Sequence, residues 1–128
     1  MVKETKYIPG VCNINPAEIR RRKNIGFMGL GTLVVLGALL FSIKALPIVW
    51  LVVFVPSFIM ATGFLQAKYR FCVGYASAGM QHAGESAAKI ENQDAMVQDQ
   101  RRARQINMQA ALIAAILTVV AIGVAFIV

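Results

Sequence analysis

Residues 25–67 read IGFMGLGTLVVLGALLFSIKALPIVWLVVFVPSFIMATGFLQA, which is two long apolar segments joined at Pro47. The first covers residues 25–46 and the second residues 47–67, and a third apolar segment follows at residues 110–128. A helix needs about 20 predominantly apolar residues to cross the hydrocarbon core of a bilayer. The sequence therefore predicts an all-α integral membrane protein with three transmembrane helices, of which the first two form a tight hairpin.

The composition of the 128 residues is that of a membrane protein. Hydrophobic side chains make up 58% of them and the mean hydropathy is +0.64, whereas apolar residues including glycine are about half of a typical soluble domain. At this length, three spans form one compact membrane domain.

The cationic residues lie on one side of the three segments. Of the thirteen Lys and Arg residues, six precede the first segment, six lie between the second and the third, and only Lys44 lies between the first and the second. Cytoplasmic flanks of membrane helices collect Lys and Arg. We therefore expect a multi-pass protein of the plasma membrane or bacterial inner membrane, with its N-terminus in the cytoplasm and its C-terminus outside.

The net charge of +7 comes from these basic residues beside the apolar segments. The basic residues stand beside the spans instead of forming an independent basic face, so we expect no nucleic-acid partner. A Lys or Arg near an anionic leaflet gains about 1 kcal/mol. The expected partner is the bilayer with its anionic headgroups, and nine cations are candidate headgroup contacts: Arg20, Arg21, Arg22, Lys23, Lys68, Arg70, Arg101, Arg102 and Arg104.

Four regions follow from the three segments. They are a cytosolic tail with the start of a basic juxtamembrane helix at residues 1–24, the hairpin at 25–67, a polar cytosolic connector at 68–109, and the third transmembrane helix at 110–128. Within the connector, Asp99 precedes Arg102 by three residues and can pair with it on a helix.

The sequence NPAE from Asn15 to Glu18 marks the start of the first helix. Asn15 can cap the helix, Pro16 suits its first position, and Glu18 puts a carboxylate in the first turn. Residues 1–14 before it are expected to be an irregular tail. Toward the other end of the chain, residues 86–128 form either one long helix with a cytosolic extension or a loop followed by a shorter helix.

The first span contains four glycines that let another helix come close: Gly26, Gly29, Gly31 and Gly37. Small residues favour helix association where lipid removes the hydrophobic driving force. They predict either packing against the other two spans or a homodimer face. In the second span, Pro56 predicts a kink near residues 52–56.

Cys12, Cys72 and His82 are the candidate soft-metal ligands, and all three lie on the predicted cytoplasmic side. Their spacing fits no closed zinc site, which takes four ligands, so a metal would need Glu85 or another carboxylate, or two chains that share a site. Thiols stay reduced in the cytoplasm, so we expect no structural disulfide. His82 lies in a polar stretch and is expected to be solvent-exposed.

Cys72 is the candidate reactive thiol. Lys68 and Arg70 precede it closely, and neighbouring cations favour a nucleophilic thiolate. The alternative is an ordinary small residue that packs at the inner interface.

The sequence shows no set of residues for catalysis or cofactor binding. The single histidine lies in the connector, and no Gly-rich phosphate loop precedes Lys-Ser or Lys-Thr. Proton pumps and cation transporters rely on ionisable groups within the membrane, and the three segments contain no Asp or Glu. We expect a protein that is not an enzyme and holds no cofactor.

Residues 15–80 resemble the small YgaP-type inner-membrane domain. The shared features are the basic lead Ala17-Glu18-Ile19-Arg20-Arg21, a glycine-containing first span, Pro56 and Gly63 in the second span, and Phe71-Cys72, Tyr75 and Gly79 after it. In that family the hairpin anchors, and in some members dimerises beside, a sulfur-handling rhodanese domain. This chain has no rhodanese domain, adds a third span, and has Cys72-Val73 where the family has Cys-Pro. The resemblance implies only a membrane-anchor architecture.

Three functions are compatible with the sequence. The leading hypothesis is a protein that works by association, as an accessory subunit or scaffold of a membrane complex or by self-association, with the connector as docking element. The second is a thiol-dependent redox or sulfur-relay protein that uses Cys72. The third and weakest is a homo-oligomeric pore lined by Thr32, Ser42, Ser57 and Thr62, whose hydroxyls are scattered along the spans.

Overall fold

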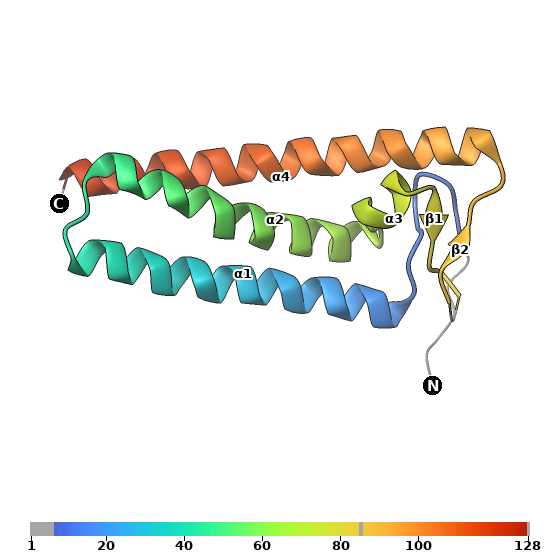
Figure 1. Ribbon diagram of the computed structural model, residues 1–128, viewed down its shortest axis with the longest axis horizontal. Coiled ribbons are helices and arrows are strands. Elements are labelled where there is room, and N and C mark those ends of the chain that lie inside the picture. The colour runs from blue at the N-terminus through green and yellow to red at the C-terminus, as the bar shows by residue number, and fades with distance from the viewer. Residues whose placement is uncertain (1–6, 85, 128) are drawn as a thin grey trace.

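The computed structural model describes residues 7–84 and 86–127, and three long helical rods dominate it (Figure 1). The first rod is α1, Pro16–Ser42. The second is a 3-10 helix, η1, Pro47–Val53, continued by α2, Phe54–Tyr69. The third is α4, Gln93–Ile127. All three rods are long and apolar enough to cross a membrane, which confirms the expected number and length of the helices.

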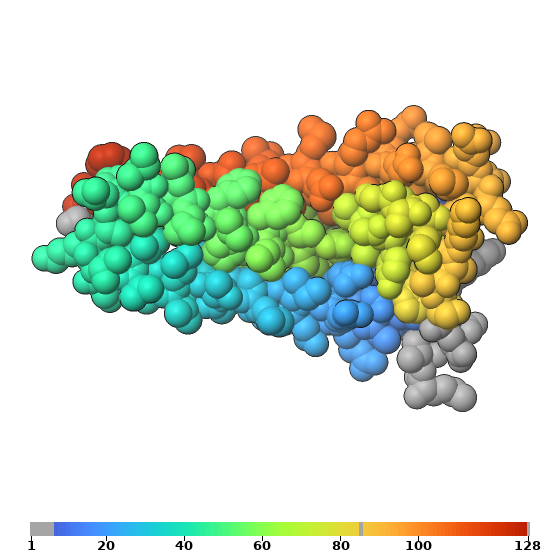
Figure 2. Space-filling model, in the orientation of Figure 1, coloured from blue at the N-terminus to red at the C-terminus, as the bar shows by residue number. Residues whose placement is uncertain are grey.

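The rods form one elongated layer in which α2 lies between α1 and α4 (Figures 1 and 2). A short turn at residues 43–46 joins α1 to η1, as the predicted tight hairpin requires. The outward faces of the rods carry exposed Leu, Ile, Val and Phe side chains along their length. Such faces suit lipid, because apolar surface of this extent is unusual on a soluble monomer.

The helices α1 and α2 end in the same way, with a basic residue in the left-handed conformation. Lys44 has φ +52° and Arg70 has φ +55°. After Lys44, the amide of Ala45 donates to the carbonyl of Leu40 at 3.0 Å, and an equivalent bond closes α2 after Arg70. This is the Schellman arrangement, in which glycine usually occupies the left-handed position. A cation there is favoured by the negative end of the helix dipole.

The α1–α2 contact is a close approach of two backbones. A Cβ added to Gly29 would lie 2.5 Å from the amide nitrogen of Met60, and one added to Gly63 would collide with the backbone of Gly26. Gly31 and Gly37 have open space around them. The glycines of the first span thus fall into two sets, one facing α2 and one facing away from the rest of the chain.

The rod η1–α2 changes from 3-10 to α geometry just before Pro56. Pro56 therefore lies in the first turn of α2, where a missing N–H interrupts no α-helical bond. The region in which the sequence predicted a kink, residues 52–56, is where this change of helix type occurs.

Helix α4 is a single helix of 35 residues that runs from the polar part of the chain into the apolar part. It begins seven residues later than the expected Ser86, because residues 88–89 pair in a short strand and Asn92 caps the helix, accepting from the Ala95 amide at 3.1 Å. Residue 128 lies outside the described residues. The buried side of α4 is a stripe of mostly small residues: Ala95, Asp99, Ala103, Ile106, Ala110, Ala114 and Thr118.

Two apolar clusters hold the rods together at their two ends. Near the N-terminal part of α4, Phe71 and Ala76 pack against Ala103 and Ile106. At the opposite end, the cluster consists of Leu40, Trp50 and Val53, with Leu33, Leu36, Ala45, Ala121, Ile122 and Ala125 packed around them.

Candidate functional site

A small polar cap closes one end of the bundle (Figure 1). We define the cap as residues 7–15 and 70–92, with residue 85 outside the described part. It contains α3, Val73–Ser77, and a two-stranded antiparallel sheet of β1, Met80–Gln81, and β2, Ala88–Lys89. The sequence predicted an irregular tail for residues 1–14. The described part of that segment is irregular, but it is packed tightly, since Cys12, Asn13 and Ile14 are all buried.

Asn13 ties this N-terminal segment to the loop between α2 and α3. Its side-chain oxygen accepts from the Cys72 amide at 2.7 Å, and its side-chain nitrogen donates to the Cys72 carbonyl at 3.1 Å. The backbone carbonyl of Asn13 also accepts from the His82 amide at 2.6 Å. The side chain is fully buried, and these bonds satisfy the polar groups that such burial would otherwise leave unpaired.

Asn15 performs two tasks at the start of α1. Its side-chain oxygen accepts from the Glu18 amide at 2.9 Å, which confirms the predicted N-cap. Its side-chain nitrogen donates to the carbonyl of Gly84 at 2.7 Å. The helix cap and the attachment of residues 80–84 therefore depend on one side chain.

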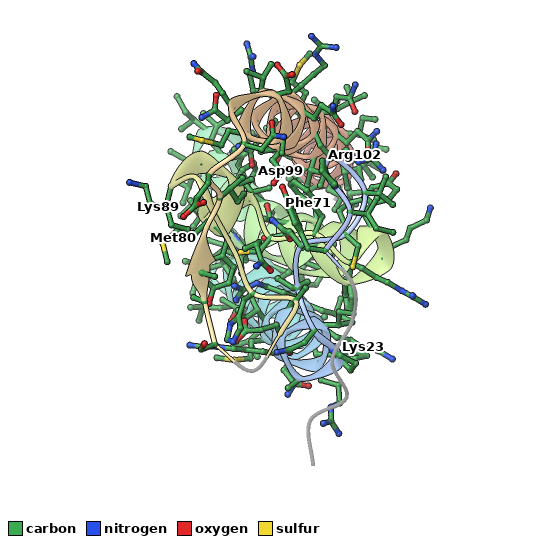
Figure 3. The ribbon with its side chains drawn as sticks, turned by 90° about the vertical axis from the view of Figure 1, so that its right-hand side faces the viewer. Lys23, Phe71, Met80, Lys89, Asp99 and Arg102 are labelled. Atoms are coloured by element: carbon green, nitrogen blue, oxygen red, sulfur yellow. The ribbon has the colours of Figure 1, made fainter. Side chains whose placement is uncertain are left out.

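Asp99 is a fully buried carboxylate on α4, in the interior of the end-on view in Figure 3. The Tyr7 hydroxyl donates to it at 2.7 Å and the Gly10 amide at 2.6 Å. Burial raises the pKa of the Tyr7 hydroxyl, and the hydrogen bond to the carboxylate raises it further. The predicted Asp99–Arg102 pair is wrong, because the carboxylate points to the N-terminal segment while Arg102 lies over the Tyr69 ring, 4.4 Å from its centroid.

A second polar cluster connects α1 to the cap. On α1, the Arg22 guanidinium lies 3.4 Å from the Glu18 carboxylate, one helical turn away. The same guanidinium nitrogen donates to the sulfur of Cys72 at 2.9 Å. Arg22, expected at the lipid headgroups, is thus turned into the protein, with 14% of its side chain exposed.

His82 completes this cluster from the other side. Its Nδ1 lies 3.5 Å from the Glu18 carboxylate and 3.2 Å from the Tyr75 hydroxyl. Burial raises the pKa of the Tyr75 hydroxyl, the negative charge of Glu18 adds to the shift, and Arg22 opposes it. The expectation that His82 is solvent-exposed is wrong, because its side chain is 17% exposed.

The arrangement of His, Cys, Asp and Glu side chains limits metal binding and thiol chemistry at the cap. Among the described residues, no three His, Cys, Asp or Glu side chains come together as a metal-binding group. Cys12 and Cys72 are free cysteines, and Cys72 is only 4% exposed. A guanidinium beside the sulfur supports a nucleophilic cysteine, whereas near-complete burial restricts the access of solutes to it.

The other cations expected at the headgroups surround the cap end of the bundle. Leaving out Lys3 and Lys6, which are not described, ten of the remaining eleven Lys and Arg residues lie there, and Lys44 lies at the opposite end. In the end-on view, Lys23 and Lys89 lie at the periphery, while Phe71 lies inside (Figure 3). We call the exposed members the cationic collar: Arg20, Arg21, Lys23, Lys68, Arg70, Lys89, Arg101 and Arg104.

The four hydroxyls of the pore hypothesis do not share a surface. Thr32 and Ser42 lie on the exposed side of α1 and donate to carbonyls of their own helix. Ser57 is fully buried, and the Thr62 oxygen is buried without a partner.

Sequence reasoning did not predict the polar contacts at this end of the bundle: it did not single out Asn13, and it gave Asp99, Glu18, Tyr75 and His82 other roles or partners. One signal was present: Glu18 and Arg22 are four residues apart and share a helix face. Tyr75 and His82 are seven residues apart. The other contacts join residues that are 50 to 92 positions apart in the chain, so patterns of neighbouring residues do not predict them.

Comparison with known proteins finds no family model, no curated protein and no solved structure that matches this chain. The resemblance to the YgaP-type hairpin domain is neither supported nor contradicted by these comparisons.

We predict that Asp99→Asn loosens the N-terminal segment. The new amide nitrogen would face one of the two donors, so at least one charge-assisted bond worth about 1.5–3 kcal/mol is lost. Hydrogen exchange followed by mass spectrometry should show the amides of residues 10–14 exchanging at least about tenfold faster. Asp94→Asn is the matched control, because Asp94 is exposed in the first turn of α4. Equal exchange in the two variants would contradict the role given to Asp99.

Proposed function

We propose that this chain is a multi-pass membrane protein that works by association, as an accessory subunit or scaffold, with the cap as its docking element on the cytoplasmic side. The observation that supports this most is the cationic collar, which surrounds a folded cap at one end of three apolar rods. Cytoplasmic flanks collect Lys and Arg. The N-terminus would then lie in the cytoplasm and the C-terminus outside, in a plasma membrane or bacterial inner membrane.

The cap has the character of an interaction module. Its buried polar side chains Asn13 and Asn15, and Asp99 of the adjoining helix α4, are engaged in bonds that join the segments of the cap to one another and to α4. The cap and the first turn of α4 also present an exposed surface, on which Lys89, Glu91 and Asp94 are all exposed. A rigid surface with charges of both signs suits a protein partner, because complementary charges give specificity and fast association.

The collar itself supports contact with anionic lipid headgroups. Arg20, Arg21 and Lys23 stand at the start of α1, and Lys68 and Arg70 at the end of α2. Each cation near an anionic leaflet gains about 1 kcal/mol. Lipid contact would fix the depth of the cap, so that its exposed surface faces the cytoplasm.

The association proposal is tested on the particle extracted from native membranes in a mild detergent. We expect other subunits in a fixed ratio with this chain, and we expect the double variant Lys89→Glu, Asp94→Lys to reduce their recovery at least about tenfold. Both side chains are exposed, so the fold should persist. Arg20→Glu, an exposed charge reversal on α1, is the control and should retain the partners. A particle of this chain alone would contradict the accessory-subunit proposal.

A second function is favoured by one specific contact, the 2.9 Å bond from Arg22 to the sulfur of Cys72. A thiol-dependent redox or sulfur-relay role would use this cysteine as the nucleophile. Cys12 differs, because its sulfur contacts the backbone carbonyl of Ile14 at 3.6 Å.

This second function predicts that Cys72 reacts with iodoacetamide faster than glutathione does at pH 7. It also predicts that Arg22→Gln slows the reaction at least about tenfold, because the donor to sulfur is removed. Arg21→Gln is the matched control, since 69% of the Arg21 side chain is exposed. Peptide-level mass spectrometry separates Cys72 from Cys12. A rate at or below that of glutathione would eliminate the thiol function.

A further inference from the structure

A cavity of about 340 Å³ opens at the end of the bundle opposite the cap. The α1–η1 turn and the C-terminal part of α4 meet at this end (Figure 1). Its lining residues are apolar except for Lys44, and they are Leu40, Phe41, Lys44, Ala45, Leu46, Pro47, Trp50 and Ala125. The volume lies within the range of sites that bind small molecules.

Among the described residues, no Asp or Glu side chain lies at the Lys44 end of the bundle. The acidic residues that the structure describes, Glu18, Glu91, Asp94 and Asp99, all lie in the cap or in the first turns of α1 and α4 next to it. The salt bridges found among the described residues all involve Glu18. Lys44 therefore lines the cavity without an acidic side chain from the described part of the chain beside it.

The backbone conformation at Lys44 is one in which glycine would be expected, so the presence of lysine needs a reason. Its φ of +52° is a conformation that glycine adopts without strain and other residues seldom adopt. Lysine is less stable than glycine in this backbone conformation, but it carries a positive charge that glycine lacks. The helix dipole gives one reason for a positive charge at this position, and the cavity gives a second.

We propose that this cavity binds one anionic phospholipid, with the phosphate against the Lys44 ammonium and an acyl chain along the apolar wall beside Trp50. Charge complementarity selects an anion, and the apolar wall selects one that carries a hydrocarbon chain. Indole rings are favoured at the membrane interface, and Trp50, which is 8% exposed, lines the cavity. The proposal relies on the proposed function only for the placement of the bundle in a bilayer.

Trp50 allows a direct test, because it is the only tryptophan of the chain. The protein is reconstituted into phosphatidylcholine vesicles that contain increasing fractions of brominated phosphatidylglycerol, which quenches indole fluorescence on contact. A parallel series contains brominated phosphatidylcholine. We expect half-maximal quenching at an about fivefold lower fraction of the anionic lipid, the factor that one juxtamembrane cation provides.

Three variants make the test specific. Lys44→Gln and Lys44→Gly should both abolish the preference for the anionic lipid, and the glycine variant keeps the left-handed turn free of strain. Ser42→Ala is the control, because Ser42 is exposed in the last turn of α1, two residues before Lys44, and is not among the residues that line the cavity. It should leave the preference intact.

Each other result overturns a defined part of the proposal. Equal quenching by the two lipids, or a preference that survives both Lys44 variants, overturns the headgroup site. Relief of quenching by millimolar glycerol phosphate would assign the site to a free phosphate ion and overturn the lipid assignment. Absence of quenching by either lipid would overturn this proposal together with the placement of the bundle in a membrane.

Discussion

The pairing of the Asn13 side chain with both backbone groups of Cys72 is the contact on which the cap depends. It fixes residues 7–15 across the end of the bundle, at bond lengths of 2.7 and 3.1 Å. Where a chain leaves a bilayer, its backbone groups need partners or water. Asn13 supplies partners at the point where α2 ends, and from this position Asn15 caps α1 and Gly10 reaches Asp99.

The structure uses its charges in two different ways at the same end of the molecule. Arg22 and Asp99 point inward, each with polar partners within hydrogen-bond distance. The collar points outward and has few partners of its own. Buried charges fix geometry because an unpaired one is costly, whereas exposed ones contribute little to stability and remain available for lipid or protein. The cap is therefore rigid inside and charged outside, which is the combination that a docking element needs.

The sequence predicted well those features that depend on neighbouring residues. Long apolar runs identified the three rods, and Asn15 with Pro16 identified the start of α1, because length and capping are local properties. The same reasoning failed for Asp99 and His82, whose partners lie elsewhere in the chain. It also gave no means of separating Gly29, which touches α2, from Gly31, which faces away, since composition records small size but not the face of the helix. The start of α4 moved from residue 86 to Gln93 because a strand pairing, another non-local contact, takes up residues 88–89.

The central claim is that the cap lies on the cytoplasmic side and the α1–η1 turn on the other, and labelling with a membrane-impermeant maleimide tests it most directly. Ser86→Cys places a thiol on the exposed cap and Lys44→Cys one at the opposite end, while both native cysteines are buried. We expect Ser86→Cys to react only in inside-out vesicles and Lys44→Cys only in right-side-out vesicles. Reaction of Ser86→Cys in sealed right-side-out vesicles would contradict the account.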